Sequence, residues 1–238
     1  MKKTNYKKPV SILLIIAVFS VVSISAVGLM TKGELSKSIL DLFVTKKDNV
    51  LLNSNYVRNT DPIATVNGLS VPKNMYMMKK TLNEVMLDYI DEDNTLTKQE
   101  KIVQKEKYPT GKESIVKEIA GKLRLIEELQ SKGVSVEDSE INEYIEQMNA
   151  RNKAKVEAGD PTAVQNEKIG QEFFSALGLS QEEYDEMYLK SEIKYALYCE
   201  KFARDFTTLD DVNTWGTFED YMKSLLANAE IVYLDENN

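Results

Sequence analysis

The stretch from Val10 to Met30 contains no charged side chain. As a helix it would rise about 31 Å, which matches the roughly 30 Å hydrocarbon core of a bilayer. Four basic residues stand immediately before it: Lys2, Lys3, Lys7 and Lys8. Basic residues favour the cytoplasmic side of a membrane. The sequence therefore predicts a cytoplasmic tail over residues 1–9, a transmembrane anchor over residues 10–30 and an extracytoplasmic remainder.

A cleaved signal peptide is the alternative for the same stretch. Its core, Ile12–Val22, has the length of a signal peptide, and Ser23 and Ser25 could form a small-residue cleavage site. The apolar run continues beyond this point to Met30, which favours a retained anchor. No cysteine lies near the end of the span, which excludes lipid attachment there.

Charge and residue content restrict the function of the remaining chain. The four lysines are the only charged residues among the first 30, so residues 31–238 keep 26 of 30 basic and all 38 acidic side chains, a net charge of −12. This charge argues against nucleic acid as a partner and favours basic or unfolded polypeptides. The chain has no histidine, which removes the commonest general base and metal ligand. We expect no cofactor, no metal site and no catalytic residue.

Two smaller features also argue against a chemical site. The acidic stretch that starts at Asp91 lacks the glycine and the final glutamate of a calcium loop. The single cysteine, Cys199, cannot form an internal disulfide and is expected to be a small buried apolar residue.

Residues 31–60 read as a juxtamembrane stalk and linker. A short amphipathic helix is predicted within this segment from five apolar residues: Leu35, Ile39, Leu40, Leu42 and Phe43. The polar, asparagine-rich stretch from Lys46 to Asp61 is typical of a linker.

The folded domain is predicted over residues 61–238, and it begins with a β-hairpin. Asn67 and Gly68 separate two β-prone triplets within Ile63–Val71, and this dipeptide favours a type I′ turn. The chain ends in a second β-prone run, Ala229–Leu234, and a lone strand needs a partner. We therefore expect the two ends of the domain to meet in one small sheet.

Helices are predicted between these strands from apolar spacing and capping residues. The seventh, Thr217–Asn228, follows a loop that contains the only tryptophan. The other six are Lys73–Asp91, Thr97–Lys107, Lys112–Ser131, Val136–Ala158, 161–177 and 180–207. Ser135 with Asp138 and Ser180 with Glu183 are expected to form capping boxes. The helix over 180–207 has apolar side chains on two faces, including a row of tyrosines, and is expected to be central and largely buried.

Three of these segments, in this order, carry a resemblance to a known family. They are Ile115–Gly133 (IVKEIAGKLRLIEELQSKG), Val134–Ile141 (VSVEDSEI) and Leu177–Phe202 (LGLSQEEYDEMYLKSEIKYALYCEKF). Together with the hairpin and the helix that follows it, they resemble the SurA N-terminal chaperone domain of parvulin-type foldases, which is similar in shape to the C-terminal part of trigger factor. The resemblance implies a mainly α fold in which a multi-helix domain carries a small sheet of the hairpin and the C-terminal strand.

The chain departs from this family in one important respect. Foldases of the family carry a parvulin isomerase domain of roughly a hundred residues before the returning helix, whereas only Leu209–Thr217 fills that position here. The resemblance therefore implies a chaperone that binds unfolded or exported polypeptides without catalysis. Two alternatives remain: an adaptor for one dedicated envelope partner, and a foldase homologue with residual prolyl isomerase activity.

Four methionines are the candidate polypeptide-binding residues: Met75, Met77, Met78 and Met86. They share one predicted helix, and the unbranched, polarizable methionine side chain suits contact with varied partners. The helical spacing of Met75, Met78 and Met86 favours a core position for these three. Met77 lies off that stripe and is the expected exposed contact.

Overall fold

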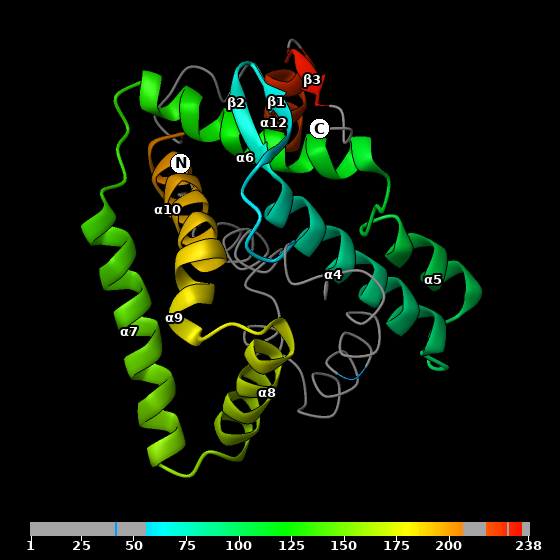
Figure 1. Ribbon diagram of the computed structural model, residues 1–238, viewed down its shortest axis with the longest axis vertical. Helices are drawn as coiled ribbons and strands as arrows, with labels where there is room; N and C mark the ends of the chain where they lie inside the picture. Colours follow the sequence, from blue (N-terminus) through cyan, green and yellow to red (C-terminus); the bar gives the residue numbers. More distant parts are fainter. Residues whose placement is uncertain (1–40, 42–55, 207–217, 228, 235–238) are drawn as a thin grey trace, which may run out of the picture.

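The computed structural model describes residues 41, 56–206, 218–227 and 229–234. Outside the described residues lie the cytoplasmic tail predicted over residues 1–9, the anchor predicted over residues 10–30, most of the 31–60 stalk and the tryptophan loop. In the part that is described, no helix is long and apolar enough to span a bilayer. This part is mainly helical and carries one small three-stranded antiparallel sheet, as the sequence predicts (Figure 1).

The sheet joins the two ends of the domain. Its strands are β1 (Pro62–Val66), β2 (Leu69–Pro72) and β3 (Ile231–Tyr233), in the order β2-β1-β3. Ala64 of β1 lies opposite both Val71 and Tyr233. The Asn67 side-chain oxygen accepts a hydrogen bond from the Glu230 backbone N–H at 2.8 Å. The predicted meeting of the hairpin with the C-terminal strand is therefore confirmed.

The β1–β2 turn needs a residue that tolerates positive φ. Asn67 and Gly68 have φ values of 47° and 81°, as a type I′ turn requires. We expect Gly68→Ala to lower the free energy of unfolding by about 1–2 kcal/mol, because an L side chain is strained there. Gly111→Ala is the comparison, since Gly111 has a φ of −67° and a Cβ there would meet only Ser114 Oγ, at 3.9 Å. It should show only the smaller loss that follows from replacing glycine by alanine at the N-cap of α6. Urea unfolding checks both variants, and an unchanged midpoint for Gly68→Ala would contradict the prediction.

The helices follow the predicted order. They are α4 (Lys73–Glu92), α5 (Lys98–Lys105), α6 (Lys112–Ser131), α7 (Asp138–Glu157), α8 (Pro161–Leu177), α9 (Gln181–Tyr184), α10 (Lys190–Phe206) and α12 (Phe218–Ala227). Asp160 caps α8, whose first residue is proline, and Ser180 caps α9 in a capping box with Glu183. These caps confirm the predicted starts.

The predicted start of α7 is wrong. The helix begins at Asp138 instead of Val136, and its capping box pairs Glu137 with Glu140. The Ser135 carbonyl accepts a hydrogen bond from Lys201 Nζ at 2.5 Å, and Val136 is buried. This anchoring to α10 holds the two residues in the loop and delays the helix.

A single π-helical turn, η1 (Asp185–Leu189), lies between α9 and α10. Such turns are rare and are frequently found at functional sites. Burial and, after it, the neighbouring Glu186 and Glu182 raise the pKa of Asp185 to about 6, while Lys190 opposes them. The turn thus holds a half-buried carboxyl group that takes up a proton at a higher pH than an ordinary aspartate.

This carboxyl group predicts a pH-dependent stability. Its folded pKa of about 6 lies above the ordinary value of 3.8, so the stability it contributes is complete below 3.8 and lost as the pH rises through 6. We therefore expect Asp185→Asn to raise the melting temperature at pH 7.5 and to leave it unchanged at pH 4. The exposed Glu167→Gln makes the same charge change on α8 and serves as the control. An equal effect of Asp185→Asn at both pH values would contradict this assignment.

Two apolar clusters form the core, and α4 lies between them. The smaller cluster joins β1 and β2 to α4 and α6, and the larger one joins α4 to α6, α7, α8 and α10. Val57 is 2% exposed in the larger cluster, and its carbonyl accepts a hydrogen bond from the Tyr188 hydroxyl at 2.6 Å. The folded domain therefore begins before Asp61, the predicted boundary.

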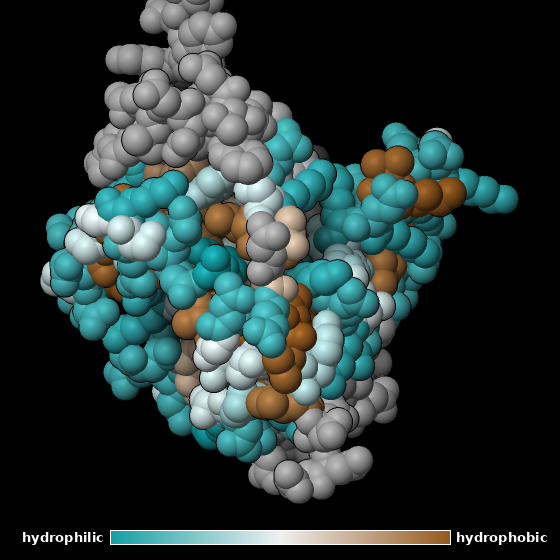
Figure 2. All heavy atoms as spheres, turned by 90° about the horizontal axis from the view of Figure 1, so that it is seen from above, coloured by the Kyte–Doolittle hydropathy of each residue, from teal (hydrophilic) through white to brown (hydrophobic). Residues whose placement is uncertain are grey.

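Two helical hairpins extend from this core on either side of α10 (Figure 1). We call α7 and α8 the first limb and α4 and α5 the second limb. The helix α6 runs across the top of the molecule beside the sheet. In the view from above, apolar side chains form separate groups among hydrophilic ones (Figure 2).

Candidate polypeptide-binding site

The four candidate methionines all lie on α4, the inner helix of the second limb. Met78 is 2% exposed in the larger cluster, and Met86 is partly buried beside it. Met75 and Met77 are partly buried and pack against both clusters. Met77 is therefore not freely exposed, contrary to expectation, because α4 is covered by apolar residues on two of its faces.

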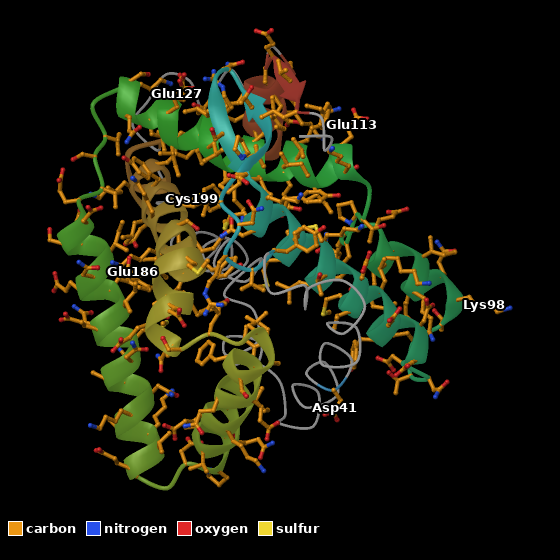
Figure 3. The ribbon with its side chains drawn as sticks, viewed as in Figure 1. Asp41, Lys98, Glu113, Glu127, Glu186 and Cys199 are labelled. Carbon is orange, nitrogen blue, oxygen red and sulfur yellow. The ribbon has the colours of Figure 1, made fainter. Side chains whose placement is uncertain are left out.

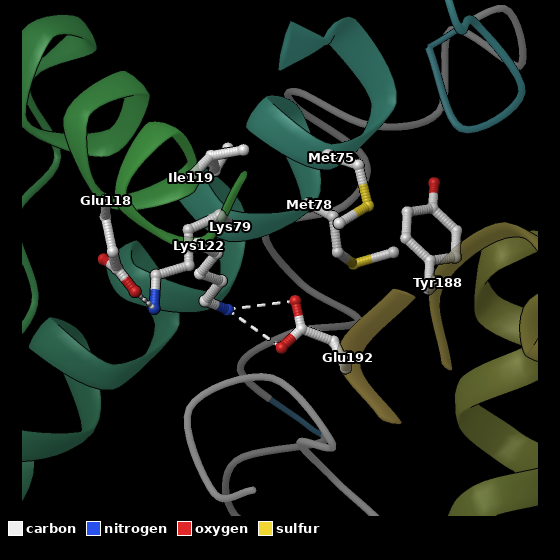
Figure 4. Close-up of a pocket in the computed structure, with 8 residues that line it drawn as sticks. All are labelled: Met75, Met78, Lys79, Glu118, Ile119, Lys122, Tyr188 and Glu192. Carbon is white, nitrogen blue, oxygen red and sulfur yellow. Dashed lines mark hydrogen bonds and ion pairs between the residues drawn. The ribbon is translucent and has the colours of Figure 1, made fainter. Parts of the chain in front are cut away.

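Met75 and Met78 line a small hollow where α4, α6 and α10 meet (Figure 4). Its volume is about 10 Å³, which is close to the room that one water molecule needs. The remaining lining comes from Lys79, Glu118, Ile119, Lys122, Tyr188 and Glu192. The hollow is too small for a polypeptide side chain in this state.

Two ion pairs cross the hollow. Lys122 Nζ of α6 donates to both carboxylate oxygens of Glu192 on α10, at 3.0 and 2.9 Å. These two side chains are 13% and 6% exposed. Lys79 Nζ of α4 lies 2.8 Å from Glu118 Oε1 on α6. The three central helices are therefore joined by partly or fully buried charges as well as by apolar packing.

Tyrosines on η1 and α10 complete the surroundings of the hollow. Burial raises the pKa of Tyr188, while a hydrogen bond with the Asn74 side chain opposes this effect. Burial also raises the pKa of Tyr195, whose ring lies 5.4 Å from Lys122 Nζ. Both phenols therefore stay neutral at physiological pH and act as packing and hydrogen-bonding groups.

Cys199 lies inside the molecule, on α10 (Figure 3). Burial raises the pKa of its thiol to about 11, while a hydrogen bond with Tyr195 opposes this effect. The thiol form therefore dominates at physiological pH, and a thiolate is the reactive form of cysteine. The burial agrees with the expected role of Cys199 as a small apolar residue.

Sequence reasoning missed the charged residues of the hollow. Lys122 falls three residues after Ile119, within the apolar stripe of α6, and Glu192 fills a gap in the tyrosine row of α10. A charged residue in an apolar stripe was the available signal. It did not identify the partner, because Lys122 and Glu192 are 70 residues apart in the chain.

Exposed apolar side chains lie on both limbs. Ile102 and Val103 of α5 are 54% and 49% exposed, and Tyr144 of α7 and Val164 of α8 are also exposed. Every side chain of α5 is at least partly exposed, so polar contacts hold this helix to α4. Lys105 pairs with the Asp91 carboxylate at 2.5 Å, and Lys101 Nζ donates to the Asp91 carbonyl at 2.7 Å. Lys98 marks the outer end of this limb (Figure 3).

The described residues contain no group of three or more histidine, cysteine, aspartate or glutamate side chains placed to hold a metal ion. Comparison with family models, with curated protein sequences and with solved structures found no match for this chain. The assignment of a function therefore depends on the arrangement of the limbs and their exposed side chains.

Proposed function

We propose that this protein is a non-catalytic chaperone that holds unfolded or exported polypeptides outside the cytoplasm, tethered by its N-terminal apolar span. The observation that carries the proposal is the presence of exposed apolar side chains on both limbs, one of which contains the methionine-rich helix α4. Unfolded chains expose apolar segments, and two separated apolar contacts can engage one such chain at the same time.

The second limb is the better defined contact point. Ile102 and Val103 are adjacent large apolar residues on α5, which packs mainly on α4 within the described residues. An apolar segment of an unfolded client that covers this pair removes its apolar surface from water, which favours binding. The acidic net charge of the chain, −8, keeps the free protein soluble and favours basic segments of a client.

Substitution of this pair tests the proposal. We expect Ile102→Ser with Val103→Ser to reduce the suppression of aggregation of an unfolded client by about threefold, which corresponds to less than 1 kcal/mol of lost binding. The melting temperature should stay unchanged, because both side chains are exposed. Light scattering of a client in the presence of the full chain in lipid nanodiscs measures the effect.

A matched control uses Gln99→Ser with Glu106→Ser, which changes two exposed polar residues in or beside α5. This control should keep full suppression. If the unmodified chain neither suppresses aggregation nor crosslinks to a client, the chaperone proposal is wrong. A peptide assay that shows accelerated prolyl isomerisation would contradict its non-catalytic part.

An adaptor for one dedicated envelope partner is the second candidate. Val232 and Tyr233 favour it, because both are exposed on β3, an edge strand of the sheet. An edge strand offers a defined docking site for one partner. Affinity purification separates the two functions: one stoichiometric partner supports the adaptor, and many substoichiometric exported proteins support the chaperone.

A further inference from the structure

The helix α7 forms the outer edge of the first limb (Figure 1). Within the described residues it packs mainly on α8 and α10. From Ile141 onward, the buried and partly buried side chains of α7 share one stripe: Ile141, Ile145, Met148, Asn152 and Val156. Gln147 is exposed and lies on the side of the helix that faces away from this stripe. We call the side around Gln147 the outer face of α7.

The outer face carries a row of three exposed polar side chains that are four residues apart. Gln147 Nε2 donates to Glu143 Oε1 at 3.0 Å, and Arg151 Nη2 donates to Gln147 Oε1 at 3.1 Å. In the described part of the chain neither Glu143 nor Arg151 forms an ion pair, and each contacts Gln147 instead. The row therefore runs from an acid through an amide to a base, and both charges are accessible to a partner.

The row belongs to a wider separation of charge along α7. Residues 137–146 contain five acidic side chains and no basic one, and residues 147–156 contain three basic side chains and no acidic one. The helix macrodipole favours such an arrangement only within the first and last turns. Glu143, Glu146 and Arg151 lie more than one turn from either end of the helix, so the macrodipole does not account for them.

We propose that two copies of this chain associate through the outer faces of α7, with the two helices antiparallel and a twofold axis at Gln147. This arrangement puts Glu143 of one copy level with Arg151 of the other, and the symmetry makes the same contact twice. A parallel arrangement would put like charges side by side, which is unfavourable. Exposed ion pairs are weak and are screened by salt, so we expect a weak dimer whose dissociation constant rises with ionic strength.

Small side chains on the outer face permit close approach of the two helices. Ala150 and Ala154 lie beside the row and are exposed, so the helix axes can come within the 8–10 Å that is typical of packed helices. Tyr144 is 36% exposed and lies opposite Ala150 of the second copy in this register. Its ring therefore adds an apolar contact to the two ion pairs.

Charge reversal tests this contact, and analytical ultracentrifugation of the full chain in detergent measures the dissociation constant. We expect Glu143→Arg alone and Arg151→Glu alone each to raise this constant about tenfold, because each places like charges at both contacts. An equimolar mixture of the two variants should regain the native value, as should the chain that carries both substitutions, since opposite charges again face each other. The control is Glu167→Arg, which makes the same charge change at an exposed position of α8 and should have no effect.

Disulfide formation tests the position of the twofold axis. In the full chain carrying Cys199→Ala, we expect Gln147→Cys to form a disulfide between two copies with about tenfold higher yield than Asn149→Cys. A residue at the axis lies next to its own counterpart, within the short distance that a disulfide requires. Asn149 is also exposed but lies on a different side of α7, so access to the oxidant is the same at both positions.

A monomeric native chain would overturn the dimer. Equal effects of Glu143→Arg and Glu167→Arg, or equal disulfide yields at positions 147 and 149, would also overturn it. If the chain that carries both charge reversals fails to regain the native dissociation constant, the antiparallel register is wrong. Dimerisation through α7 does not depend on the proposed function, and no client takes part in its test.

Discussion

Lys122→Met is expected to lower the free energy of unfolding by about 3–5 kcal/mol, because it leaves Glu192 without its ion-pair partner inside the core. The Glu192 side chain is 6% exposed, and Lys122 supplies both of its short contacts. A loss of this size approaches the whole stability of many domains. Urea unfolding followed by circular dichroism measures it, and thermal unfolding should show a clearly lower midpoint.

The double variant Lys122→Met with Glu192→Leu tests whether the ion pair itself is needed for stability, or only the absence of an unpaired buried charge. We expect Lys122→Met with Glu192→Leu to restore the stability of the native chain or to exceed it, since apolar residues of similar volume often replace a buried ion pair without loss. Methionine also packs well against the Tyr195 ring that Lys122 contacts. The exposed pair Lys117–Glu113 on the same helix is the control, and Lys117→Met there should have no measurable effect. A double variant as unstable as the single one would contradict this account.

Phe173→Ala is expected to lower the free energy of unfolding by about 3–5 kcal/mol through the cavity that it leaves. Phe173 is buried, and its ring lies edge-on to the Tyr184 ring, with 5.7 Å between the two ring centroids. This contact joins α8 to α9, so its loss should release the first limb before the rest of the domain. Hydrogen exchange should accordingly become faster in α8 than in α6.

Val164→Ala on the same helix is the matched control, because Val164 is exposed and its truncation leaves no cavity. It should neither lower the stability nor make the exchange faster, and its higher helix propensity favours a small gain. Uniformly faster exchange across α6, α8 and α10 in Phe173→Ala would show that the limb unfolds only with the whole domain, and the prediction of local release would then be wrong.

The buried ion pairs are expected to contribute to the specificity of packing. Their charges join α4, α6 and α10 and hold these three helices in one arrangement. Replacing Lys122 and Glu192 by apolar residues is nevertheless expected not to weaken the domain. Buried polar groups are retained in some proteins because they specify one packing arrangement.

Local sequence determined most of the secondary structure. Asn67 and Gly68 defined the hairpin because few other residues accept two successive positive φ values. The caps at Asp160 and Ser180 defined the starts of α8 and α9, since capping involves residues two or three positions apart. The union of the hairpin with β3 followed because a lone terminal strand requires a partner. These features depend on neighbours in the chain or on a single possible pairing.

Only the tertiary structure decided the surroundings of the individual side chains. Helical spacing placed Met77 off the apolar stripe, but a second apolar cluster covers that side of α4. The hollow between Lys79, Lys122 and Glu192 depends on how three helices cross, and the late start of α7 depends on Lys201 of α10. Sequence periodicity shows which residues share a face of a helix. The partner of that face is set by contacts between residues that are distant in the chain, and these depend on the packing of the whole molecule.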